Sequence, residues 1–249
     1  AAPGFNSQTF FNAGAGSITV SVVDFNGCSA QATINITQPA VLNPGTIAAD
    51  QVVCYGDNPA MLTETSAPNG GPAAYIFQWQ SSTNIGGPFI NIAGATLNQY
   101  TPAAGATYTL YYRRMVTSGT CMPVYSNVVG ILVNPRPVAF LTGGATICPA
   151  QSSVIRVNML AGTGPFTVEI ANHGIVNNYV SGADIVVTPA VTTTYSLIRV
   201  RDANNCEVVA PSPNLNGTAT VIVSDLPVIT SFTPSPAVCE FTLASFRVT

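Results

Sequence analysis

Val, Ile, Ala and aromatic residues alternate with Thr, Ser, Asn and Gln along most of the chain. This alternation is typical of strands with one buried face, because successive side chains of a strand point to opposite faces of its sheet. Clusters of Asn, Gly and Pro separate the alternating runs and indicate turns. The pattern therefore predicts an all-β protein.

The clearest local signal is a hairpin near the start of the chain. Residues 17–24 (SITVSVVD) and 30–37 (AQATINIT) alternate, and Asn26-Gly27 lies between them. An Asn-Gly pair between two such runs is the strongest short-range sign of a β-hairpin. A later run, 107–117 (TYTLYYRRMVT), contains the doublets Tyr111-Tyr112 and Arg113-Arg114. The alternation therefore does not show which face of this strand is buried, and a β-bulge is expected.

Two motifs recur along the chain. Residues 46–64 (TIAADQVVCYGDNPAMLTE) return in altered form at 145–158 and, shortened, at 236–249, so that three cysteines recur at intervals of 94 and 91 residues. VDFNGC at 23–28 and RDANNC at 201–206 share an Asp, a turn and a cysteine. The interval suits one small β-sandwich per unit. We predict complete units at 40–135 and 136–224, the closing half of a truncated unit at 1–39 and the opening part of another at 225–249, as expected for a section of a longer string.

The cysteines indicate disulfides rather than metal. Six cysteines occur without a CxxC pair or a Cys/His cluster, which is typical of an oxidising compartment. A domain of about 90 residues buries little surface and gains from a covalent staple. We therefore predict one disulfide within each complete unit, Cys54 with Cys121 and Cys148 with Cys206.

Two cysteines remain after this pairing. Cys28 has the position of a closing cysteine and Cys239 that of an opening cysteine, so each is expected to pair outside the chain. The alternative is a bridge between Cys28 and Cys239, which requires the string to fold back on itself at a large cost in loop-closure entropy.

The charge content excludes several classes of partner. Charged residues make up 7% of the chain, against about 25% in ordinary soluble domains, and all seven basic residues are Arg. With a net charge of −3 and no basic cluster beyond Arg113-Arg114, no nucleic-acid partner is expected. No uncharged apolar run approaches the roughly 20 residues that span a bilayer, so no membrane span is expected. No signal peptide is visible at Ala1.

No constellation of catalytic residues is apparent, so we predict no catalytic, cofactor or metal site and no enzyme. His173 lies in a turn signature, Asn172-His173-Gly174, with no nucleophile marked beside it. The carboxylates are scattered singly, which argues against a glycosidase pair. Asp24 and Asp202 precede the cysteine-containing turns and are expected to bond turn amides rather than Ca²⁺.

Three residues are candidates for a ligand surface. Trp79, the only Trp, lies in 75–82 (YIFQWQSS), where it is either a core ring, as on the third strand of immunoglobulin-like sandwiches, or a platform for a sugar. Tyr111 and Arg113 form either a binding surface or a ladder of cross-strand pairs. In both cases the structural interpretation is favoured.

Residues 18–39 (ITVSVVDFNGCSAQATINITQP) resemble the closing half of the repeat in SprB-type gliding-motility adhesins of Bacteroidetes. The unit containing CYGDNPAMLTE, YIFQWQSS and YYRRMVTSGTC is similar to the immunoglobulin-like repeats of the same secreted proteins. The next unit, with ATICPAQSSV, GTGPFTVEI and DANNC, resembles their PKD-like sandwiches. Phe25 departs from the usual Ala of the repeat, and Arg156, Arg199 and Arg201 stand where small polar residues are commoner.

The resemblance implies a non-catalytic part of a large cell-surface adhesin, exported by the type IX system and serving gliding motility or surface attachment. Tandem immunoglobulin-like and PKD-like sandwiches would form an elongated, disulfide-stapled string, its bending limited by the prolines at 39–44 and 134–137. Expected partners are neighbouring repeats of the same polypeptide, surface polysaccharide or other surface proteins. The alternative is a carbohydrate-binding array or a set of accessory modules of a secreted hydrolase.

Overall fold

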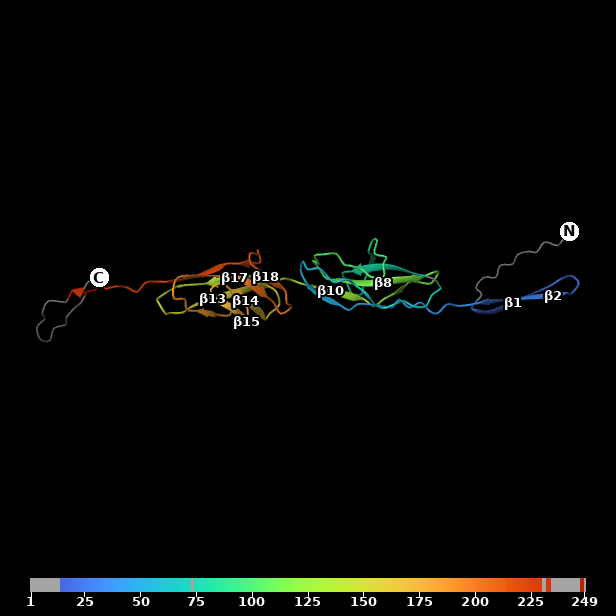
Figure 1. Cartoon of the computed structure of the whole chain (residues 1–249), viewed down its shortest axis with the longest axis horizontal. Coiled ribbons are helices and arrows are strands. Elements are labelled where there is room, and N and C mark those ends of the chain that lie inside the picture. Colours follow the sequence, from blue (N-terminus) through green and yellow to red (C-terminus); the bar gives the residue numbers. More distant parts are fainter. Residues whose placement is uncertain (1–13, 73, 230–231, 234–246, 249) are drawn as a thin grey trace. The chain divides into compact units, whose positions relative to one another are not determined.

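The computed structural model describes residues 14–72, 74–229, 232–233 and 247–248. These residues form strands and turns without a helix, so the all-β class predicted from the alternation is confirmed (Figure 1). The chain divides into two compact units. The first comprises Ala1–Gln51 and Asn58–Leu132, and the second comprises Val52–Asp57 and Val133–Thr249. The short segment Val52–Asp57 thus belongs to the second unit, although both of its chain neighbours belong to the first.

The predicted hairpin is present as β1 (Gly16–Val23) and β2 (Ser29–Ile36), in continuous antiparallel register from Val23↔Ser29 to Gly16↔Ile36. Gly27 has a φ of 82°, a conformation that the turn requires and that glycine adopts without strain. At the other end of the chain, β21 (Phe232–Thr233) pairs with β22 (Arg247–Val248).

The first unit is built around one large sheet. Its strand order is β4 (Gln51–Cys54), β10 (Val129–Asn134), β8 (Leu110–Ser118), β6 (Tyr75–Ser82) and β7 (Ile90–Asn91), with β9 (Val124–Tyr125) beside β8. Most of β4 and the last two residues of β10 are assigned to the second unit. A second, two-stranded sheet consists of β3 (Thr46–Ile47) and β5 (Glu64–Ser66). β6 and β8 pair without interruption from Tyr75↔Ser118 to Ser82↔Tyr111. The bulge expected in 107–117 is therefore absent from this pairing, because a buried arginine, Arg114, keeps the alternation intact.

The core of the first unit is aromatic. Trp79 is 0% exposed, and its indole N–H donates to the carbonyl of Leu97 at 2.9 Å. The ring of Tyr100 lies between those of Trp79 and Tyr112, with centroids 5.7 and 5.8 Å away. The aliphatic members of this core are Leu42, Ile47, Leu62, Val116, Val129 and Ile131.

The second unit is a sandwich of two sheets. One has the order β16 (Ile185–Val187), β13 (Ser153–Ala161), β11 (Val138–Gly143) and β19 (Leu215–Asn216). The other has the order β12 (Thr146–Ile147), β20 (Thr218–Val223), β17 (Thr193–Arg201), β14 (Phe166–Ile170) and β15 (Gly174–Tyr179), with β18 (Glu207–Val209) beside β17. A single cluster of buried residues from both sheets forms its core, including Leu141, Ile155, Val157, Val168, Val200 and Val221.

The observed disulfide joins Cys54 to Cys206, with the two Cα atoms 5.5 Å apart. The predicted pairs Cys54–Cys121 and Cys148–Cys206 are therefore wrong. Cys121 and Cys148 are free thiols, as is Cys28, whereas Cys239 lies outside the described residues.

Strand direction explains the wrong pairing in the first unit. The backbone N–H of Tyr55, just after Cys54, donates to the carbonyl of Asn134 at the end of β10. Ile131 of β10 pairs with Leu110 at the start of β8, whereas Cys121 follows the end of β8. Cys54 and Cys121 therefore lie toward opposite ends of the sheet.

The same argument applies to the second unit. β12 runs parallel to β20, with Ile147 paired to Val223, so Cys148 lies at the end of β20. That end pairs with the start of β17, and Cys206 follows the end of β17. Cys148 and Cys206 again lie toward opposite ends of one sheet.

Candidate functional site

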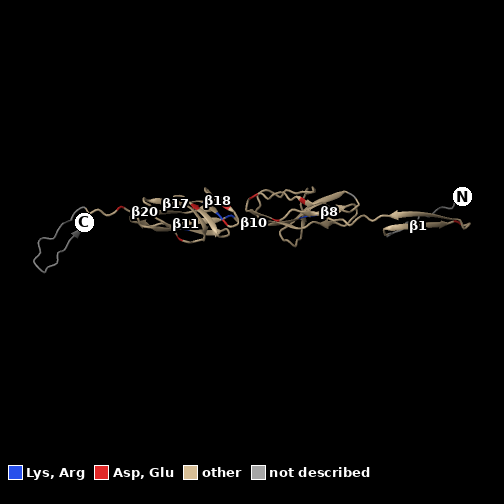
Figure 2. Ribbon diagram, turned by 60° about the horizontal axis from the view of Figure 1, so that its bottom comes forward, with Lys and Arg blue, Asp and Glu red and all other residues tan. Residues whose placement is uncertain are grey.

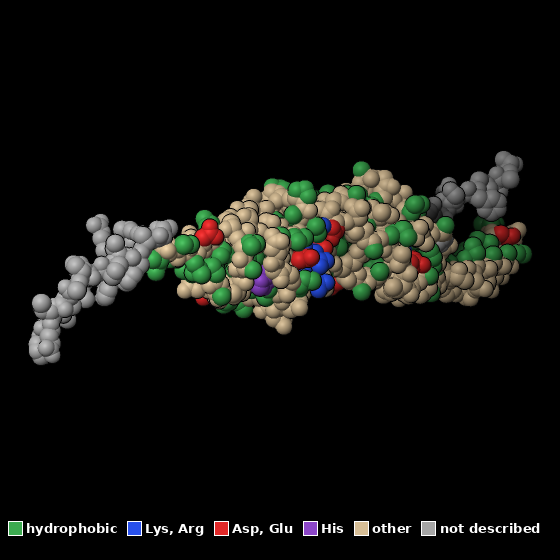
Figure 3. All heavy atoms as spheres, turned by 60° about the vertical axis from the view of Figure 1, so that its left-hand side comes forward, with side chains coloured by type: hydrophobic (Ala, Val, Ile, Leu, Met, Phe, Trp, Pro, Cys, Tyr) green, Lys and Arg blue, Asp and Glu red, His purple; other side chains and the backbone are tan. Residues whose placement is uncertain are grey.

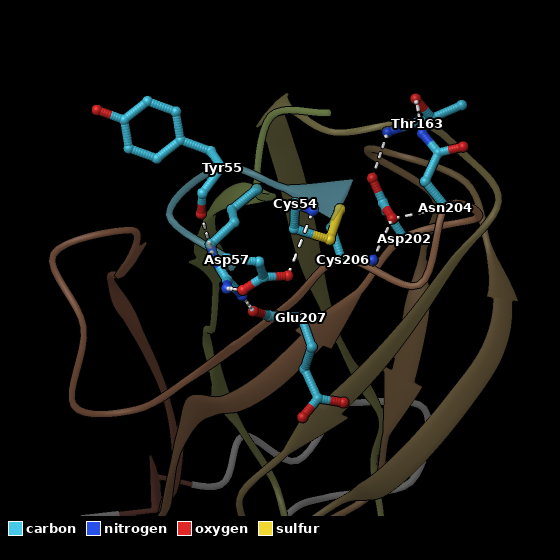
Figure 4. Close-up of a disulfide and its surroundings, with 9 residues drawn as sticks. Cys54, Tyr55, Asp57, Thr163, Asp202, Asn204, Cys206 and Glu207 are labelled. Carbon is cyan, nitrogen blue, oxygen red and sulfur yellow. Dashed lines mark hydrogen bonds and ion pairs between the residues drawn. A yellow bond between two sulfur atoms is a disulfide. The ribbon is translucent and has the colours of Figure 1, made fainter. Parts of the chain in front are cut away.

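The disulfide lies in the second unit between two ordered loops (Figure 4). The first loop is the turn that follows β17. The carboxylate of Asp202 accepts hydrogen bonds from the backbone N–H groups of Asn204 and Cys206, both at 2.9 Å, and from that of Thr163 at 3.1 Å. The interpretation that Asp202 bonds turn amides is confirmed. These bonds hold Cys206 in a fixed, buried position.

The second loop carries Cys54. The backbone N–H of Asp57 donates to the carbonyl of Cys54 at 2.9 Å, and the N–H of Cys54 donates to the Asp57 carboxylate at 3.3 Å. The bond from Tyr55 to Asn134, at 2.8 Å, ties this loop to the end of β10. The loop is therefore ordered by its own backbone and by one carboxylate.

Arg136 joins the two loops. Its Nε donates to the carbonyl of Tyr55 at 2.9 Å, and its Nη1 donates to the carbonyl of Glu207 at 2.6 Å. Its Nη2 forms an ion pair with the carboxylate of Asp57. One planar guanidinium thus bonds both sides of the disulfide, a geometry that lysine does not reproduce. The sequence analysis missed Arg136; its only signal was an arginine between two prolines, Pro135 and Pro137.

This arrangement changes the covalent connectivity of the chain. Cys54 is flanked in sequence by Gln51 and Asn58, which belong to the first unit, yet it is bonded to the second. The disulfide therefore ties the short segment Val52–Asp57 covalently to Val133–Thr249, the rest of the second unit. We define Cys54, Asp57, Arg136, Asp202 and Cys206 as the staple.

Trp79 does not share a surface with the other two candidate ligand residues, Tyr111 and Arg113. Trp79 faces the core, because its position in β6 pairs with the buried Arg114 of β8. Tyr111 lies opposite Gly130, and a Cβ added there would meet the Tyr111 ring at 3.1 Å, so the ring packs against the glycine. Trp79 is therefore no part of an exposed surface.

Arg113 belongs to a cross-strand ladder on the outer face of the sheet. Its guanidinium carbon lies 4.3 Å from the ring centre of Phe89 and 3.9 Å from that of Tyr125. Its Nε donates to Gln80 at 2.7 Å, and Gln80 donates to Asn91 at 2.7 Å. These contacts occupy the side chain with intramolecular partners.

Arg114, the next residue along β8, is fully buried. Its Nη1 donates to the Glu64 carboxylate and to the carbonyl of Asn98, both at 2.7 Å, and its Nη2 donates to the carbonyl of Pro44 at 3.0 Å. The guanidinium carbon lies 4.7 Å from the centre of the Phe77 ring. Arg114 thus links β8 to β5 and to two loops from the inside of the unit.

A small pocket in the first unit, of about 150 Å³, is lined by Pro59, Tyr108, Leu110, Tyr112 and Ile131 among others. Burial, followed by the neighbouring phenols of Tyr100 and Tyr108, raises the pKa of Tyr112 to about 12. Tyr112 is therefore neutral at physiological pH. A pocket of this size is below the range of about 300–1,000 Å³ that ligand sites occupy.

The remaining polar chemistry is dispersed. His173 is exposed in the turn before β15. Within the described residues, no group of three or more His, Cys, Asp or Glu side chains is placed to hold a metal ion. In the same residues, no helix is long and apolar enough to cross a membrane. Few stretches of the ribbon in Figure 2 have the colours of charged residues, and most atoms of the face in Figure 3 are uncharged.

A family described as a domain of unknown function, DUF8696, matches residues 43–135. No curated protein matches the chain. Among solved structures, the fibronectin(III)-like modules of Clostridium thermocellum CbhA are 11% identical, with 74% of this chain and 95% of that chain covered and a TM-score of 0.33.

Two further solved structures are similar over most of the chain. A tetra-tandem repeat from the extending region of a large adhesion protein is 14% identical, covers 89% of this chain and 58% of that chain, and has a TM-score of 0.30. Escherichia coli alpha-2-macroglobulin activated by porcine elastase is 7% identical, with 89% of this chain and 25% of that chain covered and a TM-score of 0.26. The family match covers most of the first unit and, from the second, residues 52–57 and 133–135.

Proposed function

We propose that this chain is a non-catalytic section of a large extracellular adhesion protein, in which successive β-sandwiches serve as a disulfide-stapled stalk. The observation that carries the proposal is the bond from Cys54 to Cys206, with Arg136 bonded to both sides of it. A spacer must resist bending where one unit follows another. A chain that is cross-linked between Cys54 and Cys206 has fewer accessible arrangements than a chain without the bond.

The chemistry of the staple supports an extracellular location. Structural disulfides persist in oxidising environments and are rare where thiols are kept reduced. Pro135 and Pro137 flank Arg136 and restrict the backbone where the chain enters the second unit. The stalk role therefore agrees with both the redox chemistry and the local backbone.

The finer proposal is a cell-surface adhesin of the gliding-motility type, exported by the type IX system. Its support is the resemblance of residues 18–39 and of the two complete units to repeats of those adhesins. Neighbouring repeats of the same polypeptide are the first expected partners, and surface polysaccharide or other surface proteins would contact the assembled stalk. Sugar binding is not assigned to Trp79, because the ring lies in the core.

Small-angle scattering tests the stalk. The oxidised chain should scatter as a rod, and replacing Cys54 and Cys206 together with Ser should broaden its interatomic-distance distribution, because the cross-link between these residues is lost. Cys121→Ser is the matched control, since that thiol is unbonded, and it should leave the curve unchanged. A compact globule, or identical curves for the oxidised chain and the double variant, would contradict the proposal.

A further inference from the structure

The chain contains an unbonded copy of the turn that holds Cys206. The carboxylate of Asp24 accepts from the N–H groups of Asn26 and Cys28, both at 2.8 Å, and the N–H of Asp24 donates to the carbonyl of Cys28 at 2.9 Å. The corresponding three bonds around Asp202 measure 2.9, 2.9 and 3.0 Å. Cys28 is free and exposed.

The chain also contains an unbonded copy of the loop that holds Cys54. The N–H of Cys148 donates to the side-chain oxygen of Gln151 at 3.3 Å, and the N–H of Gln151 donates to the carbonyl of Cys148 at 3.1 Å. Asp57 makes the same two bonds with Cys54, at 3.3 and 2.9 Å. Cys148 is likewise free and exposed.

Cys28 and Cys148 differ from ordinary free thiols, because the same kind of turn and the same kind of loop are joined by a disulfide elsewhere in this chain. In the staple, the loop that carries Cys54 and the turn that carries Cys206 are joined by a disulfide. The Cys148 loop is the copy of the former, and the Cys28 turn is the copy of the latter. Cys121 lacks this relationship, because the residue four positions before it is Thr117, where the turns of Cys28 and Cys206 have Asp24 and Asp202. Cys121 is also only partly exposed, so it serves as an internal control.

The ion pair of the staple has no counterpart in the corresponding positions around Cys148. In the staple, Asp57 of the loop pairs with Arg136, which precedes Pro137-Val138. In the second copy, Gln151 replaces the aspartate, and Leu226 precedes Pro227-Val228 in place of the arginine. Acid and base are thus both replaced by uncharged residues. This is the change expected if the Cys148 loop meets a turn as the Cys54 loop does, without the ion pair.

We propose that the Cys148 loop is a docking point for the Asp-x-Asn-x-Cys turn of another module of this kind, which a second copy of the chain supplies through Cys28. The inference rests on the staple of the proposed function. With oxidised glutathione as oxidant, the Cys148 thiolate attacks the glutathione disulfide and releases one glutathione thiolate. The Cys28 thiolate then attacks Sγ of Cys148 and releases the second. Two glutathione molecules carry away the two electrons and two protons, and the Cys28–Cys148 bond remains.

Mixing two complementary variants of the full chain tests the proposal. Cys28→Ser leaves Cys148 available, and Cys148→Ser leaves Cys28 available. Both would carry Cys239→Ser, and both would be equilibrated in a buffer of reduced and oxidised glutathione. Non-reducing electrophoresis should show a covalent dimer in the mixture and only monomer in either variant alone. Adding Cys121→Ser to both chains should leave the dimer yield unchanged.

Mass spectrometry of the dimer separates the outcomes. A Cys28–Cys148 bond in chains that also contain Cys54–Cys206 supports the inference. Dimers linked through Cys121, or no dimer while Cys54–Cys206 is intact, overturn the inference and leave the proposed function standing. Absence of Cys54–Cys206 itself overturns both.

Discussion

Replacing Trp79 with alanine is expected to lower the free energy of unfolding of the first unit by about 3–5 kcal/mol, the usual cost of removing a large buried aromatic side chain. The ring is 0% exposed and contacts Tyr100, and its N–H bonds the carbonyl of Leu97. Truncation leaves a cavity and an unpaired carbonyl at the centre of the unit.

Urea titration followed by circular dichroism measures this effect, because the variant lacks the only tryptophan and fluorescence cannot compare the two chains. Tyr108→Ala is the matched control, since this aromatic residue of the same unit is 61% exposed. Its midpoint should shift by less than a quarter as much. An unchanged midpoint for Trp79→Ala would place the ring outside the core and reopen a role in sugar binding.

Replacing Arg114 with leucine should also cost about 3–5 kcal/mol, because removing one member of a buried ion pair leaves its partners without compensation. The Glu64 carboxylate and the carbonyls of Pro44 and Asn98 would lose their donor inside the unit. Combining the variant with Glu64→Gln should cost less than the sum of the two single changes, since the unpaired charge is removed.

Arg113 provides a control of the same residue type in the adjacent position. Its guanidinium stacks on Phe89 and Tyr125 on the outer face of the sheet, where a cation–π contact contributes about 0.5–1 kcal/mol. Arg113→Leu should therefore shift the urea midpoint only slightly. Equal shifts for the two arginine variants would contradict the burial of Arg114 and the orientation of β8.

The sequence predicted the features that depend on neighbouring residues. Alternation predicted the strands, and Asn26-Gly27 predicted a hairpin whose strands begin and end within one residue of the expected positions. The Asp-x-Asn-x-Cys pattern predicted the bonds of Asp202 to its own turn. Each of these depends on a few consecutive residues, which is why local chemistry was sufficient.

The features it did not predict depend on which strands are neighbours. The sequence did not show which face of β8 is buried, because Arg114 takes an inward position that a hydrophobic residue usually occupies. The partners of Arg114, Glu64 and Pro44, are distant from it in sequence. Arg136 gave no signal of its own, because its role depends on two loops far from it in the chain.

The disulfide is the clearest case. A spacing of cysteines shows that units repeat, but it does not show at which end of a sheet each cysteine lies. Cys54 is the last residue of β4, and the next residue, Tyr55, bonds the last residue of β10, so Cys54 lies away from the closing turn of its own repeat. The pairing within each predicted repeat was therefore wrong, and the observed bond lies within the second compact unit instead.

Non-reducing peptide mapping of the oxidised chain tests the central claim most directly. Digestion with pepsin at acid pH keeps thiols protonated and thiol–disulfide exchange slow. The staple predicts a linked peptide pair containing Cys54 and Cys206, with Cys121 found in unlinked peptides. Recovery of Cys54 linked to Cys121, or of Cys148 linked to Cys206, would contradict the staple and support a disulfide within each predicted repeat.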